Sequence, residues 1–318
     1  MALMTPAQAR AIDPLLTQHA RGYVPQNAVG QLLFPTVGLE ARGAKVIEFS
    51  LENMGLPSSS TARSPGDPVH TESYGYTTDT VSLEDHAIDV LVPIELNQEA
   101  NAVPKISLVN EHLDIALSRM SNQREKFRAD LATDASGYAA TNKTTLASGS
   151  TAWTASGSDP IEDVEVGKHA IMDGNGGLPP NVMVLSPNAF RALKSNDVIL
   201  EQIKYTGAAP TRMNVTTGML ADLFDIDQVV VGNHRYDNAG TFVHTWGNDV
   251  VMAYSDSSSM SRRRPSYGYN YLLSGYPNVE QGRYDGDIRS WKYGYNESQK
   301  EYITMADSGY LITDAGVA

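Results

Sequence analysis

The chain has 318 residues, of which 41% are hydrophobic and 19% charged, with a formal net charge of −13 and no cysteine. This size and hydrophobic content predict one large globular domain or two ordinary ones. The acidic balance argues against nonspecific nucleic-acid binding through a basic surface, and the lack of cysteine excludes disulfides, thiolate nucleophiles and cysteine zinc sites. The start, Met1–Pro6, lacks a basic signal-peptide region, and no apolar run approaches the ~20 residues that span a bilayer, so we expect a soluble protein without a membrane partner.

The first eighty residues hold too few apolar groups for a core of their own. These groups are Leu15-Leu16, Leu32-Leu33-Phe34 and the stretch Val46–Leu51, and almost nothing aliphatic lies between Leu56 and Thr80. Such a segment is either disordered or an arm that buries its apolar groups on another surface. Residues 1–45 carry four cations and two carboxylates, a net charge of +2 that leaves −15 for the rest of the chain. The difference weakly favours docking of a basic arm on an acidic neighbour.

Short elements are predicted within this N-terminal part. A helical pattern covers residues 1–21, with Thr5-Pro6 as its start signal. Two extended runs, at 45–51 and 74–83, flank a loop rich in Ser, Pro and Gly and predict a long open hairpin. A lone two-stranded hairpin is marginally stable in water, so this one needs a partner. Residues 87–94 predict a third strand.

The strongest predicted element is one long helix over residues 107–134, which contain no Gly or Pro. Its apolar stripe recurs at three- and four-residue steps, and only Arg124 interrupts it. The stripe consists of Val109, Leu113, Ala116, Met120, Phe127 and Leu131, and the opposite face carries Glu111, Asp114, Arg119, Arg128 and Asp130. We expect an amphipathic rod of roughly 42 Å lying on a sheet.

An α/β block and a tyrosine-rich tail follow. Helices are predicted at 161–173, after Ser186-Pro187 and from Thr216, and strands at 182–185, 229–231 and 250–252. In the tail, two sets of aromatic residues alternate and should each line one face of a strand. The sets are Tyr267, Tyr269 and Tyr271, and Trp291, Tyr293 and Tyr295.

The sequence contains no recognisable catalytic or cofactor motif. The seven histidines are scattered, and Asp173-Gly174-Asn175-Gly176 begins like a calcium loop but lacks its later acidic ligands. Asp225 and Asp227 could do acid–base chemistry, although exposed pairs at a helix–strand junction are common. We therefore predict no catalytic residue, no metal and no cofactor.

The order of the segments is more specific than any one of them. The chain runs from Leu33-Phe34-Pro35-Thr36-Val37 through the hairpin to Glu84-Asp85-His86-Ala87, and then through the long helix into the block. The later segments are Asn181-Val182-Met183-Val184-Leu185-Ser186-Pro187, Leu223-Phe224-Asp225-Ile226, Val229-Val230-Val231-Gly232, Pro265-Ser266-Tyr267-Gly268-Tyr269 and Ala306-Asp307-Ser308-Gly309-Tyr310-Leu311-Ile312. Over essentially its whole length, this set resembles the major capsid proteins of tailed bacteriophages.

The resemblance implies an α+β fold with an N-terminal arm (1–44), an extended hairpin called the E-loop (45–83), a P-domain with a long spine helix (84–173 and 263–318) and an inserted A-domain (174–262). It implies a structural protein of the virion capsid, not an enzyme, whose pentamers and hexamers tile an icosahedral shell around double-stranded DNA without reading its sequence. Assembly in the host cytoplasm is expected. Arm and E-loop would bury their apolar groups on neighbouring subunits, and scaffolding, portal and decoration proteins are further candidate partners.

This sequence departs from the family in two places, so two properties of some family members are not expected here. Some members form crosslinks from a Lys in the E-loop, whereas this chain has Arg63 and no Lys between Leu51 and Thr80, so that linkage is doubtful. Some begin with a long cleaved scaffolding extension, whereas the arm here starts close to Met1, so we expect a separate scaffolding protein, if any.

The candidate assembly contacts are five arginines. Arg42 and Arg63 are isolated cations in the arm and the hairpin, which should meet an acidic neighbour. Arg262, Arg263 and Arg264 form the only basic run, which is either a solvated loop or a clamp for carboxylates. Two other functions remain open: another phage structural component, such as a tail or decoration protein, and an α/β enzyme with its site in residues 174–262.

Overall fold

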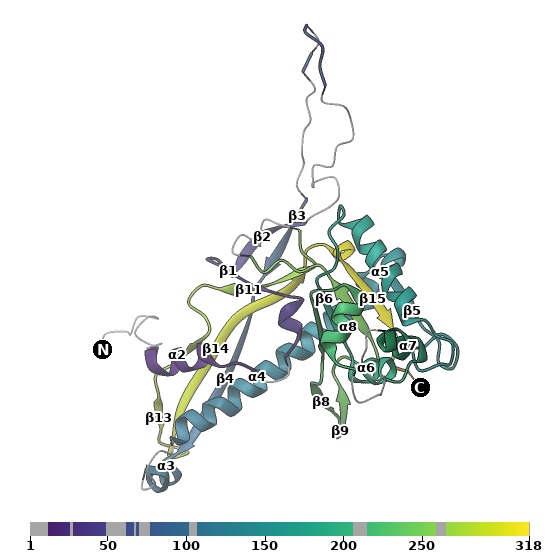
Figure 1. Cartoon of the computed structure of the whole chain (residues 1–318). Helices are drawn as coiled ribbons and strands as arrows, with labels where there is room; N and C mark the ends of the chain where they lie inside the picture. The colour runs from purple at the N-terminus through teal and green to yellow at the C-terminus, as the bar shows by residue number, and fades with distance from the viewer. Residues whose placement is uncertain are drawn as a thin grey trace.

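The chain is built around two sheets joined by one long helix (Figure 1). The structure, a computed structural model, describes residues 12–25, 28–48, 62–66, 68–69, 77–101, 107–205, 215–258 and 265–317. The predicted start signal at Thr5-Pro6, the apolar residues Phe49 and Leu51 and the basic run 262–264 therefore lie outside the described residues. Within the described part, no helix is both long and apolar enough to cross a membrane.

The first sheet has six strands centred on β14. Its strands are β1 (Thr36–Leu39), β4 (Glu84–Pro93), β11 (Gly268–Leu273), β12 (Asn278–Val279), β13 (Arg283–Asp285) and β14 (Ser290–Ile303). β14 pairs antiparallel with β4, β11, β12 and β13, and β1 pairs parallel with β11. Strands that are adjacent in this sheet are thus far apart in the sequence, because β1 and β4 pair with strands from the C-terminal part of the chain.

The long helix α4 (Leu108–Thr133) lies on this sheet and is about 39 Å long at 1.5 Å per residue (Figure 1). Ala116 packs on Val90 and Val92 of β4, while Leu113 and Met120 join Tyr295 of β14. The helix α2 (Pro14–Gly22) packs on α4 and β12, and α3 (Ile94–Asn101) follows β4 directly.

The second sheet has the order β5–β15–β10–β6–β7. Its strands are β5 (Lys143–Thr145), β6 (Val182–Leu185), β7 (Gln228–Val231), β10 (Val250–Ala253) and β15 (Gly309–Thr313), and its helices are α5 (Pro160–Gly174), α6 (Pro187–Leu193), α7 (Asp197–Tyr205) and α8 (Thr217–Phe224). Both faces of β6 and β10 are buried, which explains their continuous apolar sequences. Since β5 and β15 belong to the predicted P-domain and the other strands to 174–262, this sheet crosses both predicted boundaries.

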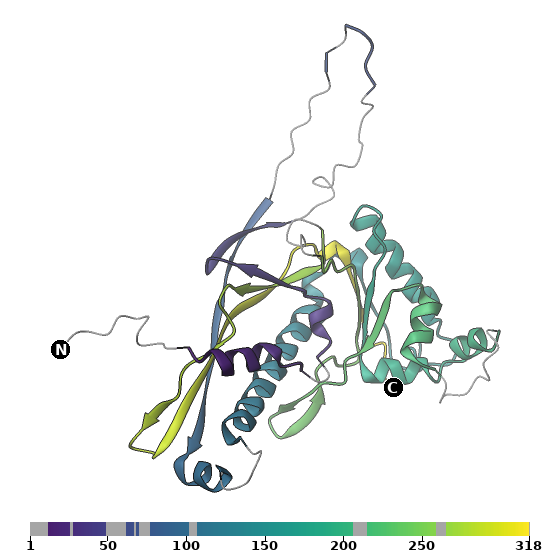
Figure 2. The same cartoon turned by 60° about the vertical axis from the view of Figure 1, so that its left-hand side comes forward.

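Two hairpins complete the fold. β2 (Gly43–Glu48) pairs with β3 (Thr77–Ser82), as predicted, and β8 (Arg235–Asn238) pairs with β9 (Thr241–His244). The base of the first hairpin packs on the subunit's own sheet, because Val46 and Val81 contact Tyr269 and Tyr271. The described residues 62–66 of its connecting loop lie far from both sheets (Figure 2).

Helix starts follow capping chemistry. Ser186 and Thr216 accept hydrogen bonds from the first-turn amides of α6 and α8, as predicted, and Asp159 does so for α5. The N-terminal helix differs from the prediction, because Asp13 caps α2 at Pro14. Ile12, predicted to be helical, instead forms an isolated bridge with Glu280.

The prediction that the N-terminal apolar groups need a neighbouring subunit is wrong for Leu33 and Phe34. Both side chains are fully buried within their own chain, among Ala129 and Ala132 of α4 and Trp246. The residues that bury them lie about 100 positions (α4) and about 210 positions (Trp246) away in the sequence, so no local sequence pattern predicts this packing. Part of the predicted arm is therefore core.

The predicted faces of α4 are also wrong toward its C-terminal end. Phe127, expected in the stripe, is 42% exposed, whereas Arg128, expected in solvent, is buried beside the fully buried Glu125. The physical reason is that this part of the helix meets polar residues of β14 and of the N-terminal segment, so its inward face is polar.

Candidate functional site

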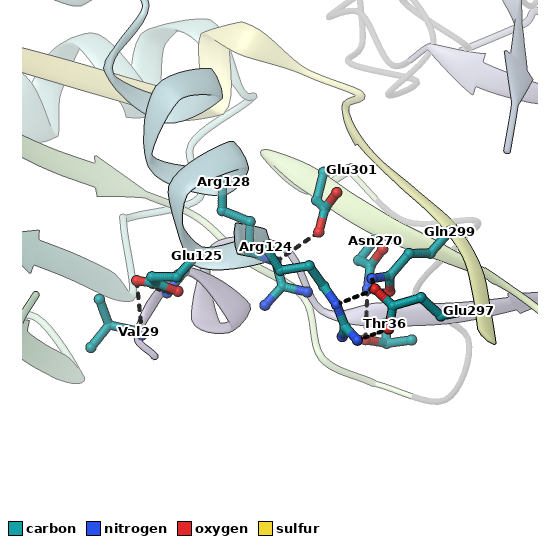
Figure 3. Close-up of polar contacts among 10 residues, drawn as sticks. Val29, Thr36, Arg124, Glu125, Arg128, Asn270, Glu297, Gln299 and Glu301 are labelled. Carbon is teal, nitrogen blue, oxygen red and sulfur yellow. Dashed lines mark hydrogen bonds and ion pairs between the residues drawn. The ribbon is translucent and has the colours of Figure 1, made fainter. Parts of the chain in front are cut away.

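Two ion pairs join α4 to the central strand β14 (Figure 3). Arg124 Nε donates to Glu297 Oε1 at 2.9 Å, and its Nη2 pairs with the second carboxylate oxygen. Arg128 Nε donates to Glu301 Oε1 at 2.9 Å, with both side chains buried. Burial lowers the pKa of Arg124. Since a buried charge is tolerated only with its partner, these pairs fix the helix against the strand.

The polar network continues from β14 to β1. Gln299 Nε2 donates to Glu297 Oε1 at 3.2 Å, and Asn270 Nδ2 donates to Gln299 Oε1 at 3.0 Å. Asn270 Nδ2 also donates to Thr36 Oγ1 at 3.3 Å (Figure 3). The N-terminal segment is therefore tied through side chains, as well as through the β1–β11 ladder, to the strand that pairs with α4.

A carboxylate on α4 holds the N-terminal segment directly. Glu125 Oε1 accepts hydrogen bonds from the amides of Val29 and Gly30, both at 3.1 Å, and its Oε2 accepts a second from Gly30 at 3.0 Å. Trp246 Nε1 donates to the same Oε1 at 2.9 Å. These donors surround a side chain that water does not reach. The result is an anchor between three distant segments.

The backbone approaches the helix closely at this anchor because residue 30 is glycine. A Cβ atom at Gly30 would lie 2.8 Å from Cβ of Arg128 and 3.0 Å from Oε2 of Glu125. Contacts that close force a displacement, so any larger residue would push the segment off the helix.

Among the five predicted contact residues, the structure describes two. Arg42 pairs with Asp85 of its own chain, at the base of the β2–β3 hairpin, and the Asp85 carboxylate raises the pKa of Arg42. Arg63 is exposed on the distant loop. Arg262, Arg263 and Arg264 fall outside the described residues. The structure does not bring the two described arginines together.

The residues that build the polar network escape prediction from the sequence. Arg124 stands out there only as an interruption of the apolar stripe, and Glu125 belongs to neither predicted face. The available signal was the alternation Glu297, Gln299, Glu301 in a strand, which places like polar groups on one face. Matching that face to Arg124 and Arg128 required the fold.

The two motifs considered for metal binding and acid–base chemistry adopt other conformations than those uses require. Nowhere in the described ranges do three or more His, Asp or Glu side chains gather as metal ligands would. Asn175 of the supposed calcium loop instead uses its amide group to bond the backbone of Leu178. Asp225 adopts a left-handed backbone at the end of α8, so Asp225 and Asp227 do not lie on an extended segment.

This arrangement, a long helix on a sheet with a protruding hairpin and a second helix-covered sheet, is shared with known capsid proteins. The capsid protein of the cyanophage P-SCSP1u has the same fold, with a TM-score of 0.58 at 10% identity, covering 92% of this chain and 89% of that one. The crystal structure of a phage-related protein from Bordetella bronchiseptica RB50 matches with a TM-score of 0.82 at 33% identity, covering 98% of this chain and all of the other.

Sequence comparison agrees with the fold. Residues 129–264 match the family described as phage major capsid protein E. The major capsid protein of Burkholderia phage BcepMu is 32% identical over an alignment of 313 residues, which covers 96% of this chain and 97% of that protein. The chain belongs to the family of tailed-bacteriophage major capsid proteins. It is therefore a structural component of the phage head shell and of the virion, and not an enzyme.

Proposed function

We propose that copies of this chain form pentamers and hexamers, which tile an icosahedral head around double-stranded DNA after assembly in the host cytoplasm. In this proposal residues 1–44 act as the arm and 45–83 as the E-loop, while 84–173 with 263–318 form the P-domain and 174–262 the A-domain. Closed rings require head-to-tail contacts, in which one subunit's protruding element meets a different surface of the next.

The feature that supports this proposal most directly is the β2–β3 hairpin. Its base packs on Tyr269 and Tyr271 of its own sheet, which fixes its direction, while residues 62–66 lie outside the body (Figure 2). Val69 in the same loop is 70% exposed. The loop could bury this side chain by lying on another subunit, which would add to the stability of the contact.

Charge suggests how the subunits recognise one another. The chain is acidic overall, so an exposed cation such as Arg63 would meet a carboxylate on most neighbouring surfaces. We assign the same role to Arg262–Arg264. Arg42, whose carboxylate partner lies in its own chain, would instead hold the hairpin base and would reach a neighbour only by exchanging Asp85.

An acidic lining would also suit a container for DNA, because it would repel phosphates and let the duplex pack without adhering. Scaffolding, portal and decoration proteins are the further partners that this assembly would need or accept.

The decisive experiment shortens the hairpin and leaves the subunit intact. Glu48 of β2 pairs with Thr77 of β3, so residues 49–76 can be replaced by Asn-Gly, the dipeptide that closes a two-residue turn. Electron microscopy of the purified full chain should show rings or shells, and the shortened chain should show separate subunits. An Arg63→Glu variant tests the loop's charge in the same assay.

The control is the unfolding midpoint in denaturant, which should be the same for both chains because the hairpin base is retained. Deleting residues 1–44 is a poorer test, since it removes Leu33, Phe34 and β1 from the core. Shells of normal shape from the shortened chain would refute the role assigned to the hairpin.

A further inference from the structure

The buried carboxylate of Glu125 lies where three parts of the chain meet. It sits on α4, and it binds the N-terminal segment at Val29 and Gly30 and the indole of Trp246, just after β9. All of these donors are uncharged N–H groups. A fully buried carboxylate is costly unless it is hydrogen-bonded, so each of these contacts offsets part of the cost of burying Glu125.

The backbone of Val29 and Gly30 is hydrogen-bonded on both its N–H and its C=O side. The amides of Val29 and Gly30 both donate to Glu125, and the carbonyls of the same two residues accept from the turn that follows. Leu33 and Gly30 are joined by one such bond at 3.1 Å, and Phe34 and Gly30 by another. Thus the short 3₁₀ turn η1 (Gly30–Leu32), which places Leu33 and Phe34 in the core, begins at the residue that Glu125 holds.

Trp246 extends the anchor to the β8–β9 hairpin. Its indole ring lies on Gly232, where a Cβ atom would be 2.2 Å from the ring, and its neighbour Thr245 bonds His234 at 2.6 Å. The N-terminal segment and the base of this hairpin therefore share one contact, the Glu125 carboxylate.

We propose that Glu125 is the positioning residue for the N-terminal segment: it holds residues 28–34 on their own subunit, so that this segment takes one position in every copy and shells form with a single geometry. The assembly part of this inference rests on the proposed function, while the anchoring part concerns the subunit alone.

Hydrogen–deuterium exchange of the full-length chain tests the anchor. In the wild type, the amides of Val29 and Gly30 should exchange about as slowly as those in the middle of α4, because both are buried and bonded. In Glu125→Gln, which keeps the size but replaces one acceptor by a donor, peptides covering 28–34 should exchange about tenfold faster. Peptides of the second sheet at α5 and α6 should be unchanged.

Two variants separate anchoring from packing. Glu111→Gln makes the same chemical change at an exposed position of the same helix and should leave exchange at 28–34 as in the wild type. Trp246→Phe removes the indole donor together with the part of the ring that packs on Gly232, and should still accelerate exchange there less than Glu125→Gln does. If Trp246→Phe loosened the segment as much, the packing of the region rather than the carboxylate would hold it.

Each outcome decides one part. Fast exchange at Val29 and Gly30 in the wild type would overturn the anchor, even if Glu125→Gln failed to fold. Fast exchange in Glu125→Gln together with normal shells by electron microscopy would overturn the assembly role alone. If the wild type formed no shell but its 28–34 amides were protected and Glu125→Gln exposed them, the anchor would stand, while assembly by this chain alone would be refuted.

Discussion

Arg128 and Glu301 form an ion pair that is nearly closed to water, between α4 and the central strand. Such a pair stabilises the fold little more than an apolar pair of the same shape would. Removing one partner is nevertheless costly, because the other charge then remains buried without a partner. Its main effect is on geometry, because the helix can slide along the strand only by breaking it. Arg124 and Glu297 repeat this restraint one helical turn away.

We expect Arg128→Met to lower the free energy of unfolding by about 3–5 kcal/mol, since it leaves Glu301 buried without its cation. Denaturant unfolding measures the change. Replacing Glu301 by Leu in the same chain should restore most of the loss. Lys126→Ala, which removes a more exposed pair with Asp130, should cost under about 1 kcal/mol. Equal losses for Arg128 and Lys126 would contradict this account.

His234 gives the subunit a pH dependence of known sign. Burial lowers the pKa of its imidazole, although the Glu125 carboxylate partly opposes the effect. The His234 imidazole should therefore be protonated near pH 6.5 in the unfolded chain, but only at lower pH in the folded chain. Stability is fully present above about pH 6.5 and falls as pH drops through the lowered pKa of the folded state.

The check is the slope of unfolding free energy between about pH 7.5 and about pH 5.5. His234→Gln should flatten it, but His244, whose pKa burial also lowers, should leave part of the slope. An unchanged slope in His234→Gln would show that the imidazole titrates alike in both states.

At the scale of elements, the N-terminal segment is divided between core and surface. Leu33 and Phe34 are buried in their own subunit, while Leu15 on α2 is 78% exposed. We expect Phe34→Ala to cost about 3–5 kcal/mol in the unfolding of unassembled chains, and Leu15→Ala almost nothing. If Phe34→Ala left the unassembled chain as stable as the wild type, the Phe34 ring would have to be buried on a neighbouring subunit instead.

Local patterns predicted the regular elements well. The long helix was expected at 107–134 and is found at Leu108–Thr133, and the strand of Val182–Leu185 with its Ser186 cap was located correctly. These segments have strong periodicity or definite caps, so their neighbours were not needed to recognise them.

What escaped prediction depends on distant partners. The strand β5 is three residues long in a Thr-, Ser- and Gly-rich stretch and exists because β15 pairs with it. The hairpin β8–β9, with Asp237 and Asn238 before its turn, has no apolar alternation. The anchor at Glu125 likewise required Val29 and Trp246 to be placed by the fold, since a lone Glu in a helix reads as a solvent residue.

At the scale of the whole molecule, the net charge of −13 opposes the gathering of many copies. Salt screens this repulsion, with a Debye length that shrinks from about 14 Å at 0.05 M to about 4 Å at 0.5 M. We therefore expect the protein concentration needed for shells to fall as sodium chloride rises over that range, which light scattering can follow. A rise would mean that ion pairs between subunits outweigh their general repulsion.

The order of the strands also bears on how the protein is made. β14 is the strand to which β4, β11, β12 and β13 all pair, so the centre of the first sheet comes from the last part of the sequence. In the second sheet, β10, β6 and β7 pair with one another, and β15 then joins β10 to β5. During synthesis, β4 must therefore remain without its partner strand until residues 290–303 emerge from the ribosome. A chain interrupted before β14 lacks the centre of its first sheet and cannot offer that surface to a neighbour.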